Sequence, residues 1–293
     1  MAGLADPQDR APEREAADRA SGPEPGLGQV VLSLLVGLTL AVFLGGGALF
    51  VTGSLAVAAL MLELGLLAGV ILTLLARRQR PWGALRLRPV PRSIYVLAAV
   101  LGLVLLLVNI GASLLLGPPT RDIEFVISAE GTAERILLAV SIGLLAPLIE
   151  EMLFRGLLQG TLERRVRPWT AIGFTAVAFG ALHGPQGAVL FFVWSLPVGW
   201  VTWRLDSIRP AVVIHAINNG IGLLGLLVTG AAEPPEPEGG AGSLALGVLL
   251  LAGAGLWIVT LCRRVDEVAA RAEPWRVPGA LSKPETDASR NDG

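Results

Sequence analysis

Eight apolar segments, each close to the length of a membrane-spanning helix, constrain this chain more than any other feature. A helix needs about 20 predominantly apolar residues to cross the hydrocarbon core of a bilayer. The segments cover residues 29–51, 54–76, 94–116, 134–161, 168–184, 187–204, 208–229 and 243–262. The sequence therefore predicts an all-α, polytopic membrane protein with about eight transmembrane helices in contact with the lipid bilayer.

The composition supports a membrane protein. The chain has 293 residues, of which 53% are hydrophobic and 16% are charged, whereas soluble domains carry about 25% charged residues. The formal net charge is −1, so no overall positive charge favours a nucleic-acid partner. Cys262 is the only cysteine in the sequence, which excludes an intramolecular disulfide.

The polar ends and the apolar segments divide the chain into five parts. Residues 1–28 are rich in proline, alanine and charge and are predicted to be a disordered cytoplasmic tail. Residues 263–293 are similarly polar and are predicted to be a second cytoplasmic tail. The membrane-embedded parts are N-terminal transmembrane helices at 29–133, a core at 134–229, and a last loop with its transmembrane helix at 230–262.

The arginines predict how the chain is oriented in the membrane. They cluster in the loops at 77–92, 164–167 and 204–209 and directly after the last span, whereas residues 183–187 and 229–242 carry no arginine or lysine. The exception is Arg121 and Arg135, between the third and fourth spans, where acidic residues balance them. Eight alternating spans place all of the clusters on one side, and positively charged loops favour the cytoplasmic side. We therefore expect a multi-pass protein of the cell membrane with both termini in the cytoplasm.

The stretch "LLAPLIEEMLFRGLLQG" carries charged side chains within an apolar span. A charge at the centre of a bilayer costs roughly 2.5–3.5 kcal/mol on insertion scales. Glu151 and Arg155 are four residues apart, so they share a helix face and can form an ion pair. Glu150 is rotated by about 100° from Glu151. Glu151 and Arg155 can thus be a purely structural pair, while Glu150 is free to face a functional cavity.

Histidines and amides form the second polar group in the spans. His183 and His215 are the only histidines; Phe179 precedes the first by four residues, and Asn219 follows the second by four. Residues four apart on a helix point in one direction. Two further polar residues, Glu63 and Asn109, also lie in apolar spans. A hydrogen bond between helices is the simplest role for each of these two, but Glu63 has no partner in its own helix and is a secondary site candidate.

These groups suit two kinds of chemistry. A carboxylate can take a proton from water, and imidazole or amide groups can donate hydrogen bonds to a developing oxyanion. Alternatively, Glu150, His183 and His215 are a ligand set that could bind zinc. Acids and histidines in spans also serve proton relays, so a proton-coupled transporter is a third hypothesis.

Three motifs, "EEMLFR", "FGALH" and "HAINN", follow one another in the apolar spans. They resemble, in the same order, the E-E-x-x-x-R, F-x-x-x-H and H-x-x-x-N motifs of the CAAX prenyl protease 2/abortive-infection (CPBP) family of intramembrane proteases. The resemblance covers residues 134–229 and implies an endopeptidase that cleaves a membrane-associated peptide or protein. An alternative is a non-catalytic membrane binding or bacteriocin-immunity-type protein that uses the same polar cavity.

The resemblance also implies a role for each motif residue. Glu150 would activate water and His183 would assist that step. His215 and Asn219 would stabilise the oxyanion. The supporting residues would be Glu151, Arg155 and Phe179. No cofactor is assigned on this interpretation, and zinc bound by Glu150, His183 and His215 is the alternative.

Overall fold

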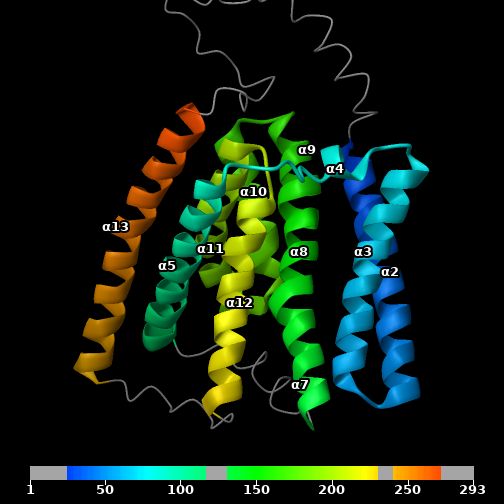
Figure 1. Ribbon diagram of the computed structural model, residues 1–293, viewed down its shortest axis with the longest axis horizontal. Helices are drawn as coiled ribbons and strands as arrows, with labels where there is room; N and C mark the ends of the chain where they lie inside the picture. Colours follow the sequence, from blue (N-terminus) through cyan, green and yellow to red (C-terminus); the bar gives the residue numbers. More distant parts are fainter. Residues whose placement is uncertain (1–24, 117–130, 230–239, 272–293) are drawn as a thin grey trace, which may run out of the picture.

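The computed structural model describes residues 25–116, 131–229 and 240–271, and every regular element in these ranges is a helix (Figure 1). The predicted all-α class is therefore confirmed. The elements are α2 (Leu27–Thr52), α3 (Leu55–Ala76), α4 (Pro81–Ala84), α5 (Arg92–Leu116), α7 (Gly131–Val140), η1 (Ser141–Leu145), α8 (Ala146–Glu151), η2 (Met152–Gln159), α9 (Gly160–Glu163), α10 (Pro168–Leu182), α11 (Gly184–Leu205), α12 (Arg209–Thr229) and α13 (Ala241–Arg271).

Six helices in the described part of the chain are long and apolar enough to cross a membrane. They are α2, α3, α5, α11, α13 and the continuous helix of 33 residues from Gly131 to Glu163, which includes α7, η1, α8, η2 and α9. The chain is thus a multi-pass membrane protein. Of the eight predicted spans, α10 is a shorter apolar helix, and α12 carries His215, Asn218 and Asn219. That these two helices cross the membrane stays a prediction.

The turn between α10 and α11 differs from the loop predicted at residues 183–187. α10 ends at Leu182 and α11 begins at Gly184, so His183 alone joins them. Gly184 has a φ of 77°, a left-handed conformation that glycine adopts without steric strain. The 15 residues of α10 span about 22 Å at 1.5 Å per residue, which is less than the hydrocarbon thickness of about 30 Å. His183 therefore lies at the tip of a short helical hairpin.

The helices form a bundle with a pair of helices at each flank (Figure 1). At one flank, α2 and α3 pack tightly, because a Cβ on Gly65 or Gly69 would overlap the backbone of Ala41 or Gly37. Small residues allow such close approach of membrane helices. At the other flank, α13 packs along α5. The middle of the bundle holds α8, η2, α10, α11 and α12. The motif residues lie on α8, η2, α10 and α12, except His183, which joins α10 to α11.

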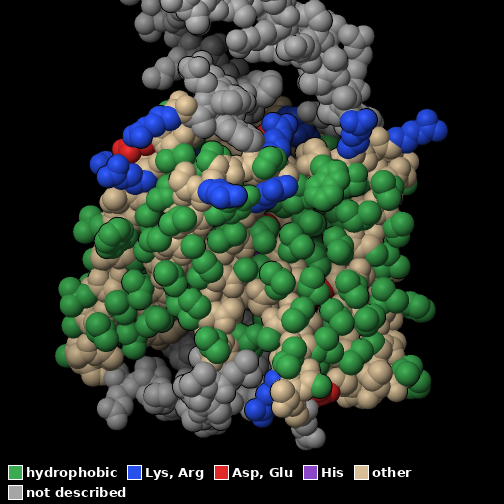
Figure 2. Space-filling view, viewed as in Figure 1, with side chains coloured by type: hydrophobic (Ala, Val, Ile, Leu, Met, Phe, Trp, Pro, Cys, Tyr) green, Lys and Arg blue, Asp and Glu red, His purple; other side chains and the backbone are tan. Residues whose placement is uncertain are grey.

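Apolar side chains fill the centre of the bundle and also cover its sides. Ile149, Leu157, Phe179, Val198 and Ile214 are fully buried members of one core. Outside, hydrophobic side chains cover the flank in view, while arginine side chains form a band across one end (Figure 2). A wide apolar belt is the surface that a bilayer requires, because lipid offers no hydrogen bonds to polar groups.

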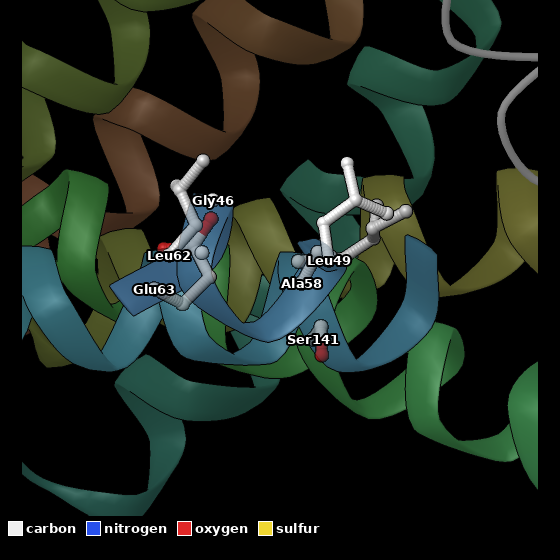
Figure 3. Close-up of a pocket in the computed structure, with 9 residues that line it drawn as sticks. Gly46, Leu49, Ala58, Leu62, Glu63 and Ser141 are labelled. Atoms are coloured by element: carbon white, nitrogen blue, oxygen red, sulfur yellow. The ribbon is translucent and has the colours of Figure 1, made fainter. Parts of the chain in front are cut away.

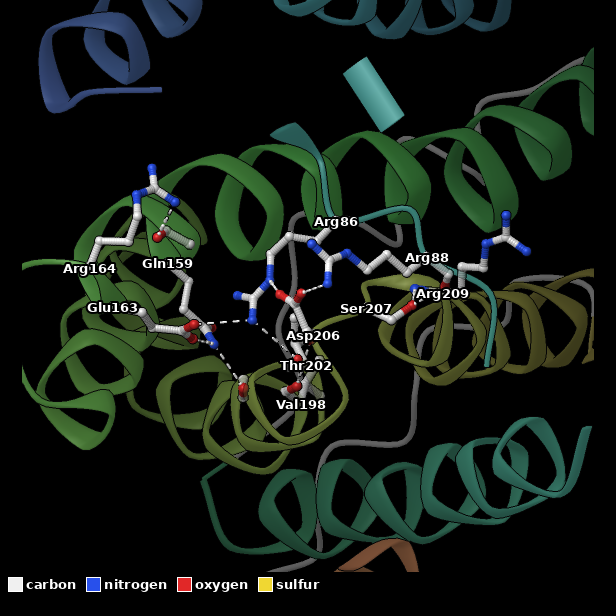
Figure 4. Close-up of polar contacts among 12 residues, drawn as sticks. Arg86, Arg88, Gln159, Glu163, Arg164, Val198, Thr202, Asp206, Ser207 and Arg209 are labelled. Carbon is white, nitrogen blue, oxygen red and sulfur yellow. Dashed lines mark hydrogen bonds and ion pairs between the residues drawn. The ribbon is translucent and has the colours of Figure 1, made fainter. Parts of the chain in front are cut away.

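A polar network at the arginine-rich end joins the helices of the core (Figure 4). Arg86 is 7% exposed and pairs with Glu163 of α9 at 3.0 Å and with Asp206, after α11, at 2.7 Å. Arg88 also pairs with Asp206, at 2.6 Å. The backbone N–H of Ile208 donates to the carbonyl of Arg86 at 3.0 Å. The segment after α4 therefore fixes the ends of α9, α11 and α12 relative to one another.

The arginine band generates a prediction on orientation. Single cysteines at Thr52, the last residue of α2, and at Arg80, just before α4, lie at opposite ends of the bundle and are both exposed. In a Cys262→Ala background, we expect Thr52→Cys to react with a membrane-impermeant maleimide in intact cells. Arg80→Cys should react only after permeabilisation, because arginine-rich loops remain cytoplasmic. The opposite labelling pattern would contradict the predicted orientation.

Candidate functional site

An ion pair between Glu151 and Arg155 lies at the centre of the bundle. Both side chains are 0% exposed, and Arg155 Nη1 lies 3.2 Å from Glu151 Oε1, as the four-residue spacing predicts. Arg155 Nη2 donates a hydrogen bond of 2.8 Å to Ser195 Oγ on α11. The guanidinium also lies 4.4 Å from the ring centroid of Phe179 on α10. This cation–π contact and the ion pair together compensate for burial of the charge.

His215 extends the ion pair to α12. Its Nδ1 lies 2.9 Å from Glu151 Oε1. An ionised carboxylate only accepts hydrogen bonds, so Nδ1 carries the hydrogen. In the neutral ring the other nitrogen, Nε2, then has a free lone pair. The ring is held in place by Trp194, whose ring centroid lies 4.8 Å from that of His215.

Glu150 lies beside this chain of contacts but outside it. Its side chain is 28% exposed, and its Oε2 lies 3.8 Å from His215 Nε2. That separation is too long for a direct hydrogen bond. Glu150 Oε2 is itself buried without a hydrogen-bond partner. This oxygen is therefore an acceptor that no donor among the described residues satisfies.

His183 is close to the same cluster but makes different contacts. Its Nδ1 forms a hydrogen bond of 2.8 Å with the carbonyl of Phe179, the residue four positions earlier. Its ring stacks on Phe191 with centroids 4.1 Å apart and lies 4.5 Å from the ring of Phe179. The ring of Phe179 also approaches His215, at 5.8 Å. Phe179 therefore packs against both imidazoles, while no described hydrogen bond joins His183 to Glu150.

The amides of α12 bind main-chain oxygens of neighbouring helices. Asn219 Nδ2 donates to the carbonyl of Ile142 in η1 at 3.0 Å, which leaves its second amide hydrogen free for another acceptor. Asn218 Nδ2 donates to the carbonyl of Gly102 on α5 at 2.7 Å. Asn109 donates to Asn218 Oδ1 at 2.9 Å, so the helix–helix hydrogen bond expected for Asn109 is present.

Two features of this centre were not predicted from the sequence. First, π-helical segments, η1 and η2, stand on either side of α8, which carries both glutamates. Such segments are frequent at functional sites, but no residue pattern in this sequence predicts them. Second, Trp194 and Ser195 support His215 and Arg155. The sequence did contain a signal for the role of Ser195, because Ser195 is a polar residue inside an apolar span.

The proposed zinc ligands are not arranged as a metal site. Among the described residues, no three His, Cys, Asp or Glu side chains are grouped so that they could hold a metal ion. Glu150 Oε2 and His215 Nε2 lie 3.8 Å apart, but His183 is not grouped with them closely enough to complete a three-ligand set. The described geometry therefore does not fit the three-ligand set of Glu150, His183 and His215.

A comparison with known families identifies a match for the part of the chain that holds this centre. Residues 132–221 match the family model described as type II CAAX prenyl endopeptidase Rce1-like. The matched segment contains all of the candidate catalytic residues, and it confirms the resemblance drawn from the motifs. No curated protein and no solved structure matches the chain.

The central ion pair generates a prediction on stability. Arg155→Ala leaves Glu151 buried without its cation, and breaking a buried pair costs about 3–5 kcal/mol. Glu150→Ala removes a partly exposed side chain that has no such partner. We expect Arg155→Ala to reduce the yield of monodisperse protein after detergent extraction and its melting temperature far more than Glu150→Ala does. Equal effects would show that the Glu151–Arg155 pair does not stabilise the fold.

Proposed function

Because residues 132–221 match the family model of the type II CAAX prenyl endopeptidases, we propose that this protein is an intramembrane endopeptidase. Its reaction is hydrolysis of a peptide bond in a membrane-associated peptide or protein. One observation carries the proposal: Glu150 Oε2 and His215 Nε2 are two proton acceptors, 3.8 Å apart, inside a bundle of apolar helices. Two such acceptors can hold one water molecule between them.

Glu150 activates this water. Its buried Oε2 has no other hydrogen-bond partner, so it accepts one hydrogen of the water, and His215 Nε2 accepts the other. The water oxygen then attacks the carbonyl carbon of the substrate as its proton passes to Glu150. General-base catalysis of this kind contributes about 10²–10⁴-fold to a rate. Glu150 subsequently returns the proton to the leaving amine.

Donors for the oxyanion come from α12. Asn219 uses one amide hydrogen to hold Ile142 and has a second hydrogen for the substrate oxygen. In this step His215 accepts a water hydrogen at Nε2, while its Nδ1–H donates to Glu151. Its stabilisation of the oxyanion is therefore indirect, through the position of the attacking water. A single oxyanion donor is worth about 10²–10³-fold in kcat.

The other motif residues position these groups. Arg155 neutralises Glu151, and Glu151 orients His215. His183 anchors its Nδ1 on the Phe179 carbonyl. With the hydrogen on Nδ1, its Nε2 is an acceptor that can bind water, which is the assisting role we propose for it.

The test compares the proteins of cells that carry wild-type protein with those of cells that carry Glu150→Gln. This variant keeps the size of the side chain but is not a base. Sequencing of protein N-termini from isolated membranes should reveal cleavage products that disappear in Glu150→Gln, with at least a 10²-fold loss of rate on the substrate so identified. The matched control is Glu267→Gln, the same change on the exposed end of α13.

The result also separates the two classes of function. Products that persist in Glu150→Gln, while the variant is folded and present at wild-type level, would contradict Glu150 as the base. Identical sets of N-termini with and without the wild-type protein would support the non-catalytic membrane binding or immunity-type protein instead.

The role of zinc is tested on the purified protein. We propose that hydrolysis proceeds without a bound metal, because the described histidines and carboxylates form no three-ligand group. Protein prepared without chelator should contain far less than one zinc per chain by elemental analysis, and its cleavage activity should persist in EDTA. Stoichiometric zinc that is lost in His183→Ala and His215→Ala, with chelator-sensitive activity, would establish the zinc mechanism.

A further inference from the structure

A cavity of about 380 Å³ lies between the α2–α3 hairpin and η1. Its wall consists mainly of small or apolar residues, namely Gly45, Gly46, Leu49, Ala58, Ala59, Leu62 and Ile142, with Glu63 and Ser141 as the polar members. Figure 3 shows Gly46 and Glu63 on the blue helices and Ser141 on the green helix beside them. The cavity is thus a hollow in the apolar flank with a carboxylate in its wall.

The carboxylate of Glu63 lacks a partner. Its Oε2 is buried and makes no hydrogen bond within the described structure. A buried acceptor without a donor is costly, and a charged one more so. Glu63 lines the cavity, so the cavity has space beside this side chain for a donor from another molecule.

The electrostatic balance of the region favours a cationic donor. Glu63 forms no ion pair with an arginine or lysine among the described residues, and neither does Glu150. Glu150 lies next to Glu151 in α8, and the guanidinium of Arg155 pairs with Glu151. Charges inside a membrane protein are normally paired. A positively charged group beside Glu63 would restore that balance.

The cavity is also adjacent to the proposed catalytic centre. Its wall includes Ile142, whose carbonyl accepts the hydrogen bond from Asn219. Ser141 and Ile142 belong to η1, which leads directly into α8 and Glu150. A chain that occupies the cavity therefore lies within a few residues of the bond that Glu150 and His215 would hydrolyse.

We propose that this cavity is a substrate subsite in which Glu63 binds a basic side chain, lysine or arginine, of the peptide to be cleaved. The apolar wall takes the aliphatic part of that side chain, and the carboxylate pairs with its charged end. Identification of the occupant as substrate rests on the proposed function, but occupancy of the cavity does not require cleavage.

The experiment measures capture of two photoreactive peptides by the full-length protein in lipid nanodiscs. The peptides share one apolar sequence with a diazirine beside a single variable position, which is lysine in one and norleucine in the other. A hydrogen bond to a charged group is worth about tenfold or more in affinity. We therefore expect the lysine peptide to be captured about tenfold more, at low peptide concentration, with cross-links on α2, α3 or η1.

Two variants test the assignment. Glu63→Gln should reduce capture of the lysine peptide to the norleucine level, whereas Glu267→Gln should leave it unchanged. Gly46→Leu should fill the cavity and reduce capture of both peptides. Gly47→Leu is its matched control, because a Cβ on either glycine meets no atom within 4 Å but Gly47 does not line the cavity.

Each outcome is decisive for the subsite. Equal capture of the two peptides by wild-type protein, or a lysine preference that survives in Glu63→Gln, would overturn it. If Glu63→Gln does not fold, the test rests on Gly46→Leu. Peptide capture that is unaffected by Gly46→Leu would also overturn the subsite. Lysine-selective capture by a protein that yields no cleavage products would uphold the subsite and refute the protease.

Discussion

The positive charge of Arg155 is buried inside a bundle that faces lipid, so it needs partners on neighbouring helices. The arrangement of the central helices follows from that requirement. Glu151 provides the counter-charge, Ser195 an acceptor and Phe179 a ring face. These three partners come from α8, α11 and α10. Glu151 also binds His215, which adds α12. The buried charge of Arg155 thus fixes four segments relative to one another. Leaving this charge unpaired inside the bundle would cost more free energy than any one of these contacts contributes.

The same arrangement separates two adjacent glutamates by function. Glu151 is held through its Oε1, which contacts both the guanidinium of Arg155 and the imidazole of His215. Glu150, one position earlier, points to a different side, where its Oε2 lies near His215 Nε2 but has no hydrogen-bond partner. The two glutamates thereby acquire different roles from their surroundings alone. Glu151 positions the imidazole, and Glu150 is available to take a proton.

The α2–α3 hairpin is connected to the core in a different way. Its own polar contacts are internal: Gln29 donates to the carbonyl of Thr73 at 2.9 Å, and Ser33 bonds the Thr73 hydroxyl at 2.7 Å. Towards the core, Ser54 donates to Glu134 near the turn of the hairpin. Between these ends the contact is largely apolar packing that leaves the cavity lined by Glu63. The hairpin is therefore a separate flank against which a substrate could lie.

The sequence determined those features of this protein that depend on local periodicity. A span expected at 54–76 is a helix from Leu55 to Ala76, and the spacing of Glu151 and Arg155 was sufficient for their ion pair. The ordered motifs likewise indicated the family that residues 132–221 match. Helix length, helix face and motif order are all properties of neighbouring positions, so they can be read without a fold.

Only the tertiary structure decided which polar groups meet. His215 binds Glu151 from 64 positions away, and Asn219 reaches Ile142 from 77 positions away. Helix periodicity gives the face of each residue but not the helix that this face contacts. The helical joint at His183 and the π-helical turns around α8 also escaped prediction. They arise because packed helices must satisfy buried charges and amides with the partners that the bundle brings near, a constraint that acts between segments rather than along them.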